Sequence, residues 1–211
     1  MKMIIGAIVL SVIPILNWPF SWLETFFHEL SHGLAAILTG GSILNITLTF
    51  DGAGTCTTRG GWPPLITWAG YAGAALWGMA ITMSASESHR RLSPALTALL
   101  MATMLISTIC CMSNGVSLLV MLIIYLLWMA AVFMQAKTKN AFILKRFLQF
   151  SGIYVTISAV ISPLYQLISS VGDSKQLARM SGISEGFWVL SWELLALGVI
   201  WRLWQQAGRS E

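Results

Sequence analysis

The feature that most restricts how this chain can fold is a group of ionisable residues, His-Glu-Leu-Ser-His at 28–32, inside the apolar stretch 22–38. If this stretch is an α-helix, His28 and His32 lie one turn apart on one face, where two imidazole nitrogens can bind one metal ion. Glu29 then points about 100° around the helix from His28, close enough to activate a metal-bound water without being a ligand. The pattern therefore predicts a metal site with an adjacent general base.

The scarcity of ionisable residues makes this pattern more informative than it would be in a soluble chain. The sequence has 3 His and 8 acidic residues in 211, and two of the histidines and one of the acids fall in this pattern. The alternative is a chance match, with histidines that are merely hydrogen-bonded in the core. Uncompensated ionisable groups are costly in lipid, so we favour the functional interpretation.

Composition indicates a polytopic membrane protein without a separate soluble domain. Hydrophobic residues make up 56% of the chain and charged residues 9%, and the mean hydropathy is +0.76, a combination typical of integral membrane proteins. We therefore expect an all-α polytopic fold with about six transmembrane helices, forming a single integral-membrane domain over residues 1–211. The apolar runs, the first of them short, are 4–16, 22–38, 64–83, 94–112, 116–134, 147–168 and 187–204.

Between the second and third runs the pattern changes to that of a β-hairpin. Residues 43–50 are β-prone, 51–54 form a turn with two glycines, and 55–58 can return alongside. We expect a short hairpin directly after the His28 helix. Its free edge could pair with an extended peptide, as proteases commonly hold a substrate, or the hairpin could simply connect two spans.

Basic residues indicate which way the chain crosses the membrane. They cluster at 89–91, at 137–146 and around Arg202 and Arg209, whereas the turn at Asn114 has none. The positive-inside rule places these clusters in the cytoplasm and Asn114 outside. The first part of the chain, up to residue 83, is harder to assign. If Lys2 is cytoplasmic and the chain crosses the membrane twice before residue 40, the 64–83 run ends on the outside, next to the basic residues at 89–91.

The same clusters bear on binding partners and location. The formal charge of +4 is confined to segments that flank the membrane, which favours anionic lipid headgroups as the contact and not nucleic acid. We expect a multi-pass protein of a cell membrane, such as the bacterial inner membrane.

Small residues and one further acid surround the predicted metal site. The run 70–75 and Gly78 would let a neighbouring helix approach closely, most naturally the His28 helix. Gly33 lies one turn beyond Glu29 and would leave room there for water or a peptide. Glu24 lies one turn before His28 and could orient it.

Catalytic zinc generally keeps three protein ligands, so the two histidines require a third. His89 lies in a basic loop and Asp51 in a turn, which makes both poor candidates. Asp173 follows Gly172, where irregular backbone is allowed, although Asp173 with Gln176 also forms a capping-box pattern that would open a short helix ending at Met180. Glu193 lies in the middle of the last apolar run and is the acid that most needs a partner.

Several of these segments together resemble the M50B-like branch of the site-2 protease superfamily, which are integral-membrane zinc metallopeptidases. The segments are 27–41, which ends in Thr-Gly-Gly, the Gly54-Thr55 turn, 69–73, and 172–183 ahead of a last span that contains Trp. The resemblance implies that His28 and His32 are zinc ligands, that Glu29 is the base and that Asp173 is the third ligand.

We therefore expect an intramembrane zinc metalloprotease that hydrolyses peptide bonds of membrane-spanning or membrane-adjacent substrates. Its partners would be a membrane protein or peptide substrate and the lipid bilayer, with no nucleic acid; the sequence leaves the oligomeric state open. The alternatives are a transporter or sensor that uses the same residues as a metal site, and a noncatalytic membrane partner protein that has kept the motif.

Overall fold

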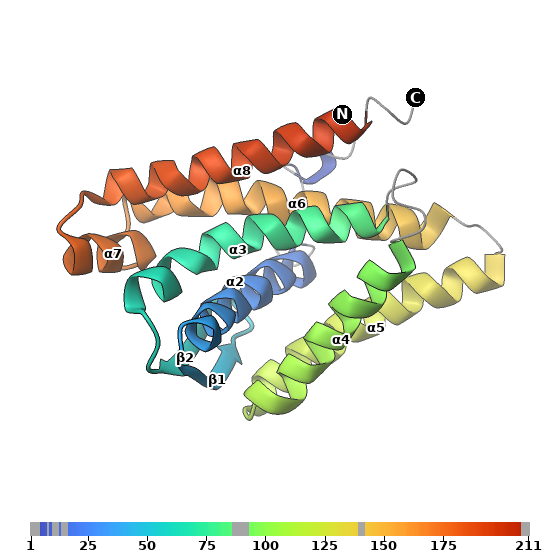
Figure 1. The fold of residues 1–211 in the computed structure, drawn as a ribbon. Helices are drawn as coiled ribbons and strands as arrows, with labels where there is room; N and C mark the ends of the chain where they lie inside the picture. The colour runs from blue at the N-terminus through green and yellow to red at the C-terminus, as the bar shows by residue number, and fades with distance from the viewer. Residues whose placement is uncertain are drawn as a thin grey trace.

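The computed structural model describes residues 5–7, 9, 13, 17–85, 93–138 and 142–207. His89, most of the first apolar run and the Arg90–Arg91 pair lie outside these residues. The described elements, shown in Figure 1, are α2 (Trp18–Leu38), β1 (Ser42–Leu48), β2 (Gly54–Arg59), α3 (Pro63–Ser84), α4 (Ser93–Cys111), α5 (Gly115–Thr138), α6 (Phe142–Gln166), α7 (Asp173–Ser181) and α8 (Glu185–Ala207).

Four of the described helices, α3, α5, α6 and α8, are long and apolar enough to cross a membrane, and α4 contains a shorter apolar stretch, Ala95–Cys111. Such a set indicates a multi-pass membrane protein. The prediction of a mostly helical chain with a short hairpin after the His28 helix is confirmed.

Helix α3 lies at the centre of the bundle because its glycines allow close approach on two sides. A side chain at Gly73 would overlap Ser31 of α2, and one at Gly78 would overlap Thr156 of α6. Gly152 of α6 in turn lies against Thr82 of α3. Helices pack tightly in membranes where small residues remove the side chains between their backbones. The predicted α2 neighbour is therefore confirmed for Gly73, whereas Gly78 faces α6.

The hairpin packs on α2 and is anchored to the start of α5. Strands β1 and β2 are antiparallel, with Ile46 opposite Cys56, and Ile46 and Leu48 are buried in one core cluster with Phe26 of α2. The backbone N–H of Leu48 donates to Ser117 Oγ at 2.8 Å, and the Ser117 hydroxyl donates to the Leu48 carbonyl at 3.3 Å. The α4–α5 turn is therefore held beside the hairpin.

The ends of the helices divide into two groups. The hairpin, α7 and the α4–α5 turn lie toward one end of the bundle, and the ends of α5 and α8 that carry Lys137 and Arg202 lie toward the other (Figure 1). Helices α2, α3, α4, α5, α6 and α8 run alternately in the two directions between these ends (Figure 1).

We predict that the hairpin turn and the Asn114 turn face the same side of the membrane, opposite to Lys137, because the basic clusters favour the cytoplasm. Single cysteines at exposed Ala53, Asn114 and Lys137 would be placed in a background without the three native cysteines. An impermeant maleimide added from outside should label positions 53 and 114 and leave 137 unlabelled. Labelling of 53 and 137 from the same side would contradict the assignment.

Candidate metal centre

Helix α2 turns two histidines toward α3 and a glutamate toward the hairpin. The helix has Pro19 in its first turn, where the missing N–H is tolerated, and it ends before Gly40, which adopts a positive φ of 86° that favours glycine. Its middle is buried on almost every side, including at Glu29 and His32. Ionisable groups in such surroundings need partners.

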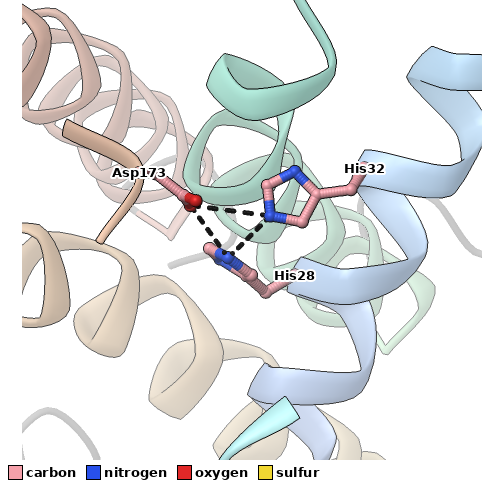
Figure 2. Close-up of side chains that lie close together, drawn as sticks. All are labelled: His28, His32 and Asp173. Carbon is pink, nitrogen blue, oxygen red and sulfur yellow. Dashed lines mark hydrogen bonds and ion pairs between the residues drawn. The ribbon is translucent and has the colours of Figure 1, made fainter. Parts of the chain in front are cut away.

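The imidazoles of His28 and His32 and the carboxylate of Asp173 converge on one point (Figure 2). The two Nε2 atoms are 3.0 Å apart, and Asp173 Oδ2 lies 3.2 Å from His28 Nε2 and 3.5 Å from His32 Nε2. Ligand atoms held tetrahedrally at about 2.0–2.1 Å from one zinc ion are about 3.3–3.4 Å apart. The triangle therefore has the size of one face of a zinc coordination tetrahedron, and the three residues fit such an ion.

A backbone carbonyl fixes the orientation of one imidazole. His32 Nδ1 lies 2.7 Å from the Ile66 carbonyl oxygen of α3, which can only accept a hydrogen bond. The proton therefore lies on Nδ1, and the lone pair of Nε2 points into the triangle, as in many metal sites where the second ring nitrogen donates to the backbone.

Gly70 provides the space in which the two imidazole rings lie. A Cβ atom at this position would be 2.5 Å from His32 Cε1 and 2.6 Å from His28 Cε1. No real Cβ approaches a ring carbon so closely, so any other residue at position 70 would displace the rings. Within the small-residue run of α3, Gly70 is thus the glycine that lies against both histidines.

Glu29 lies beside the triangle and is not one of its corners. Its carboxylate accepts a backbone hydrogen bond from Cys56 of β2 and interacts electrostatically with both histidines and with Asp173. A Cβ atom at Gly54 of β2 would be 2.8 Å from Glu29 Cγ, so this glycine also permits the close approach. Burial and the negative charge of Glu29 raise the pKa of the Cys56 thiol to about 12.

Asp173 reaches the histidines from the first position of α7. The residue that caps this helix is Gly172, at a φ of 144°, with no side-chain cap in the described chain, so the capping-box interpretation of Asp173 and Gln176 is wrong. The short helix itself was predicted correctly. Burial opposes ionisation of Asp173, but its interactions with His28 and His32 prevail and lower the pKa of the carboxyl group.

The remaining predicted residues lie outside the triangle. Glu193 is on α8, and its Oε1 atom is buried with no hydrogen-bond partner among the described residues. Asp51 is an exposed turn residue that accepts hydrogen bonds from Thr49 and from the Ala53 N–H, and these lower the pKa of its carboxyl group.

Glu24 is buried near His28, where it was expected to orient the imidazole. His28 Nδ1 has no hydrogen-bond partner among the described residues, so Glu24 does not hydrogen-bond this nitrogen.

The expectation that Gly33 leaves room for water or a peptide is wrong. A Cβ atom at Gly33 would be 2.5 Å from Ile43 Cδ1 and 3.4 Å from Cys56 Sγ, so the hairpin fills the space. The glycine serves to admit β1 and not a ligand. Sequence spacing placed Gly33 correctly on the Glu29 side but could not show what would pack there.

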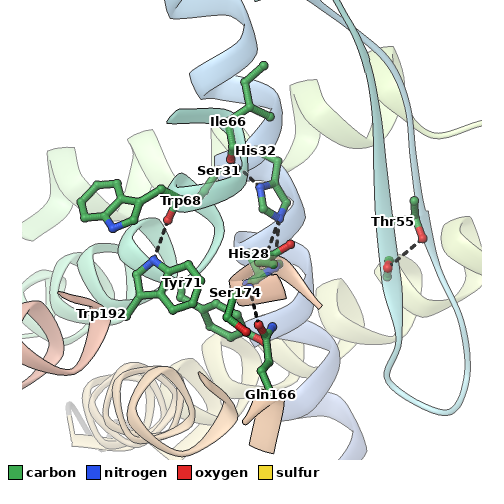
Figure 3. A network of polar contacts seen from close by, with 12 residues as sticks. His28, Ser31, His32, Thr55, Ile66, Trp68, Tyr71, Gln166, Ser174 and Trp192 are labelled. Carbon is green, nitrogen blue, oxygen red and sulfur yellow. Dashed lines mark hydrogen bonds and ion pairs between the residues drawn. The ribbon is translucent and has the colours of Figure 1, made fainter. Parts of the chain in front are cut away.

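Sequence reasoning missed the contribution of Tyr71, next to Gly70. Its ring lies edge-on to His28, with centroids 4.4 Å apart, and also contacts Trp192 of α8 (Figure 3). Tyr71 fell within a run that was interpreted only through its small residues. A tyrosine inside a small-residue run was the signal that could have identified it.

The family model described as Peptidase M50B-like matches residues 1–203. No curated protein and no solved structure matches the chain.

We predict that Gly70→Ala abolishes zinc binding while the protein still folds, because the added methyl group occupies the space of the imidazole rings. Gly198→Ala on α8 is the matched control, since a Cβ atom there meets nothing within 4 Å. Metal analysis of the detergent-purified proteins would compare the two. Stoichiometric zinc in Gly70→Ala would show that the rings do not need this space.

Proposed function

Because the chain belongs to the peptidase M50B-like family, we propose that it is a zinc metalloendopeptidase that hydrolyses peptide bonds of membrane-spanning or membrane-adjacent substrates. The observation that carries the proposal is the convergence of His28, His32 and Asp173 with Glu29 beside them. Three such ligands are the set that catalytic zinc sites use, with one coordination position left for water or substrate.

Different residues of this chain would bind the metal and transfer the proton during hydrolysis. Zinc held by His28, His32 and Asp173 would supply a Lewis acid that polarises a carbonyl group and lowers the pKa of water. The Glu29 carboxylate takes a proton from water as the water oxygen bonds to the carbonyl carbon, and it delivers this proton to the amine nitrogen as the C–N bond breaks. Water and one peptide bond thus give a carboxylic acid and an amine, which near neutral pH are a carboxylate and an ammonium group, and Glu29 returns to its ionised form.

Partial exposure of the three proposed ligands is consistent with entry of water and substrate. The side chains of His28, His32 and Asp173 are 12%, 11% and 18% exposed. They are thus mostly buried, with a small part of each side chain reaching the surface of the bundle. Hydrolysis needs such access because water is itself a reactant.

The outer edge of β2 is the proposed binding surface for the substrate backbone. The edge of β1 at Leu48 is occupied by Ser117 of α5, whereas the Cys56 backbone of β2 faces Glu29. A peptide added as a strand along β2 would run past the base in extended form. An extended segment is required because a helical peptide bond is shielded by its own hydrogen bonds and side chains.

We also propose that α2 and α4 cross the membrane beside the four long apolar helices, which gives six spans in a single domain over residues 1–211. Helix α2 has 21 residues and α4 has 19, so both have about the length that the hydrocarbon layer requires. The ionisable residues of α2 face α3 and the hairpin, where partners offset their cost in lipid.

We predict about one zinc ion per chain, lost in His28→Ala and in His32→Ala, because each change removes a proposed ligand. Glu29→Gln should keep the zinc and lose about 10²–10⁴-fold in turnover, the usual contribution of a general base. Turnover would be measured on quenched-fluorescence peptides that carry an apolar membrane segment. A transporter or sensor needs the ligands but not the base, so unchanged function in Glu29→Gln would favour that class.

We predict that Asp173→Ala loses both hydrolysis and tight zinc binding, whereas Glu193→Ala keeps the zinc. Asp173→Asn should be affected less completely, because an amide oxygen remains as a weak ligand. Zinc affinity would be measured by competition with a chromophoric chelator. Retention of zinc in Asp173→Ala together with its loss in Glu193→Ala would mean that α8 carries the third ligand.

A further inference from the structure

Gln166 is a buried polar residue in a segment that is otherwise exposed. It is the last residue of α6 and is 9% exposed, whereas Tyr165 before it and Ile168 after it are 65% and 84% exposed. Burial of an amide is unfavourable unless its hydrogen bonds are made. The proposed hydrolytic steps do not use Gln166, so its burial needs a separate explanation.

Both ends of the Gln166 amide are hydrogen-bonded, to two different helices (Figure 3). Its Nε2 donates to the Tyr71 hydroxyl of α3 at 2.8 Å, and its Oε1 accepts from the Ser174 N–H of α7 at 2.8 Å. One side chain thereby joins α6, α3 and α7. The amide can do this because it carries N–H donors on Nε2 and an acceptor oxygen, Oε1, in the same group.

The bond to Ser174 acts directly next to the proposed ligand. The first N–H groups of a helix lack partners inside the helix, and Gly172 has no side chain to cap them. Gln166 caps Ser174 from another helix and so fixes the residue that follows Asp173. A Cβ atom at Gly172 would be 2.8 Å from Gln166 Cδ, so the amide also packs directly against this backbone.

The hydrogen bond to Tyr71 connects Gln166 to the histidine side of the site. The Tyr71 ring lies edge-on to His28 at 4.4 Å, and its hydroxyl is held by Gln166. We propose that Gln166 is a positioning residue that sets Asp173 at metal-binding distance from the two histidines. This inference rests on the metal site of the proposed function.

Helix α7 has other anchors, so loss of Gln166 would release only its first turn. Leu177 is fully buried in a cluster with Ala72, Val189 and Trp192. Lys175 forms an ion pair with Glu185 at 2.8 Å. The body of α7 therefore stays packed on α3 and α8 when the Gln166 amide is removed.

The test compares Gln166→Ala with Gln149→Ala, a change of the same type on the same helix. Among the described residues Gln149 makes one long hydrogen bond, from Nε2 to the Ala85 carbonyl at 3.5 Å, far from the triangle along α6. Zinc affinity of the full chain would be measured by chelator competition, the ligand set by the visible spectrum of the cobalt-substituted protein, and folding by the melting temperature without metal. Tyr71→Phe would remove only the hydroxyl that holds Gln166.

We expect Gln166→Ala to bind zinc roughly 10- to 100-fold more weakly than Gln149→Ala, as is typical when a group that orients a ligand is lost. Its cobalt spectrum should change, its metal-free melting temperature should match that of the control, and Tyr71→Phe should show a smaller loss of affinity. Equal zinc affinity in the two glutamine variants would overturn the inference, and so would an unaltered cobalt spectrum with a lowered melting temperature. Absence of zinc from the unaltered chain would instead refute the proposed function itself, and the inference with it.

Discussion

The burial of ionisable groups in an apolar bundle is the constraint on which the rest of this structure depends. Glu24, Glu29 and Asp173 lie near two histidines, all of them largely shielded from water. Ionised carboxylates in such surroundings are strongly unfavourable unless positive charge or hydrogen-bond donors lie close to them. The packing of α2, α3, α7 and the hairpin brings these groups together, so the fold and the site cannot be understood separately.

Glycines are the means by which the elements come close enough. Gly70 admits the imidazole rings, Gly54 admits Glu29, and Gly73 admits Ser31. In lipid, helix association gains little from the hydrophobic effect and relies on close backbone packing and hydrogen bonds. Small residues thus do two things here: they hold the helices together, and they leave the space that polar side chains of the site occupy.

The sequence predicted the parts of the site that depend on local geometry and was weak on those that depend on tertiary contacts. The one-turn spacing of His28 and His32 follows from helix periodicity alone, and the hairpin follows from its turn residues. Asp173 lies 141 residues after His32, and from the residues alone it could not be separated from Glu193. The Ile66 carbonyl that orients His32 has no sequence signature at all, because every residue carries a carbonyl group.

Charge balance explains why a cation suits this site better than a purely internal hydrogen-bond network. One proton between the facing Nε2 atoms of His28 and His32 would satisfy their 3.0 Å contact, yet it would leave the carboxylates of Asp173 and Glu29 with at most one positive charge between them. A divalent ion brings the net charge of the ion and those two carboxylates to zero while both imidazoles stay neutral. The hydrogen bond from His32 to the Ile66 carbonyl favours a neutral His32 with its proton on Nδ1. The cost of placing acids in an apolar bundle is thereby offset where the proposed chemistry needs them ionised, with Asp173 as ligand and Glu29 as base.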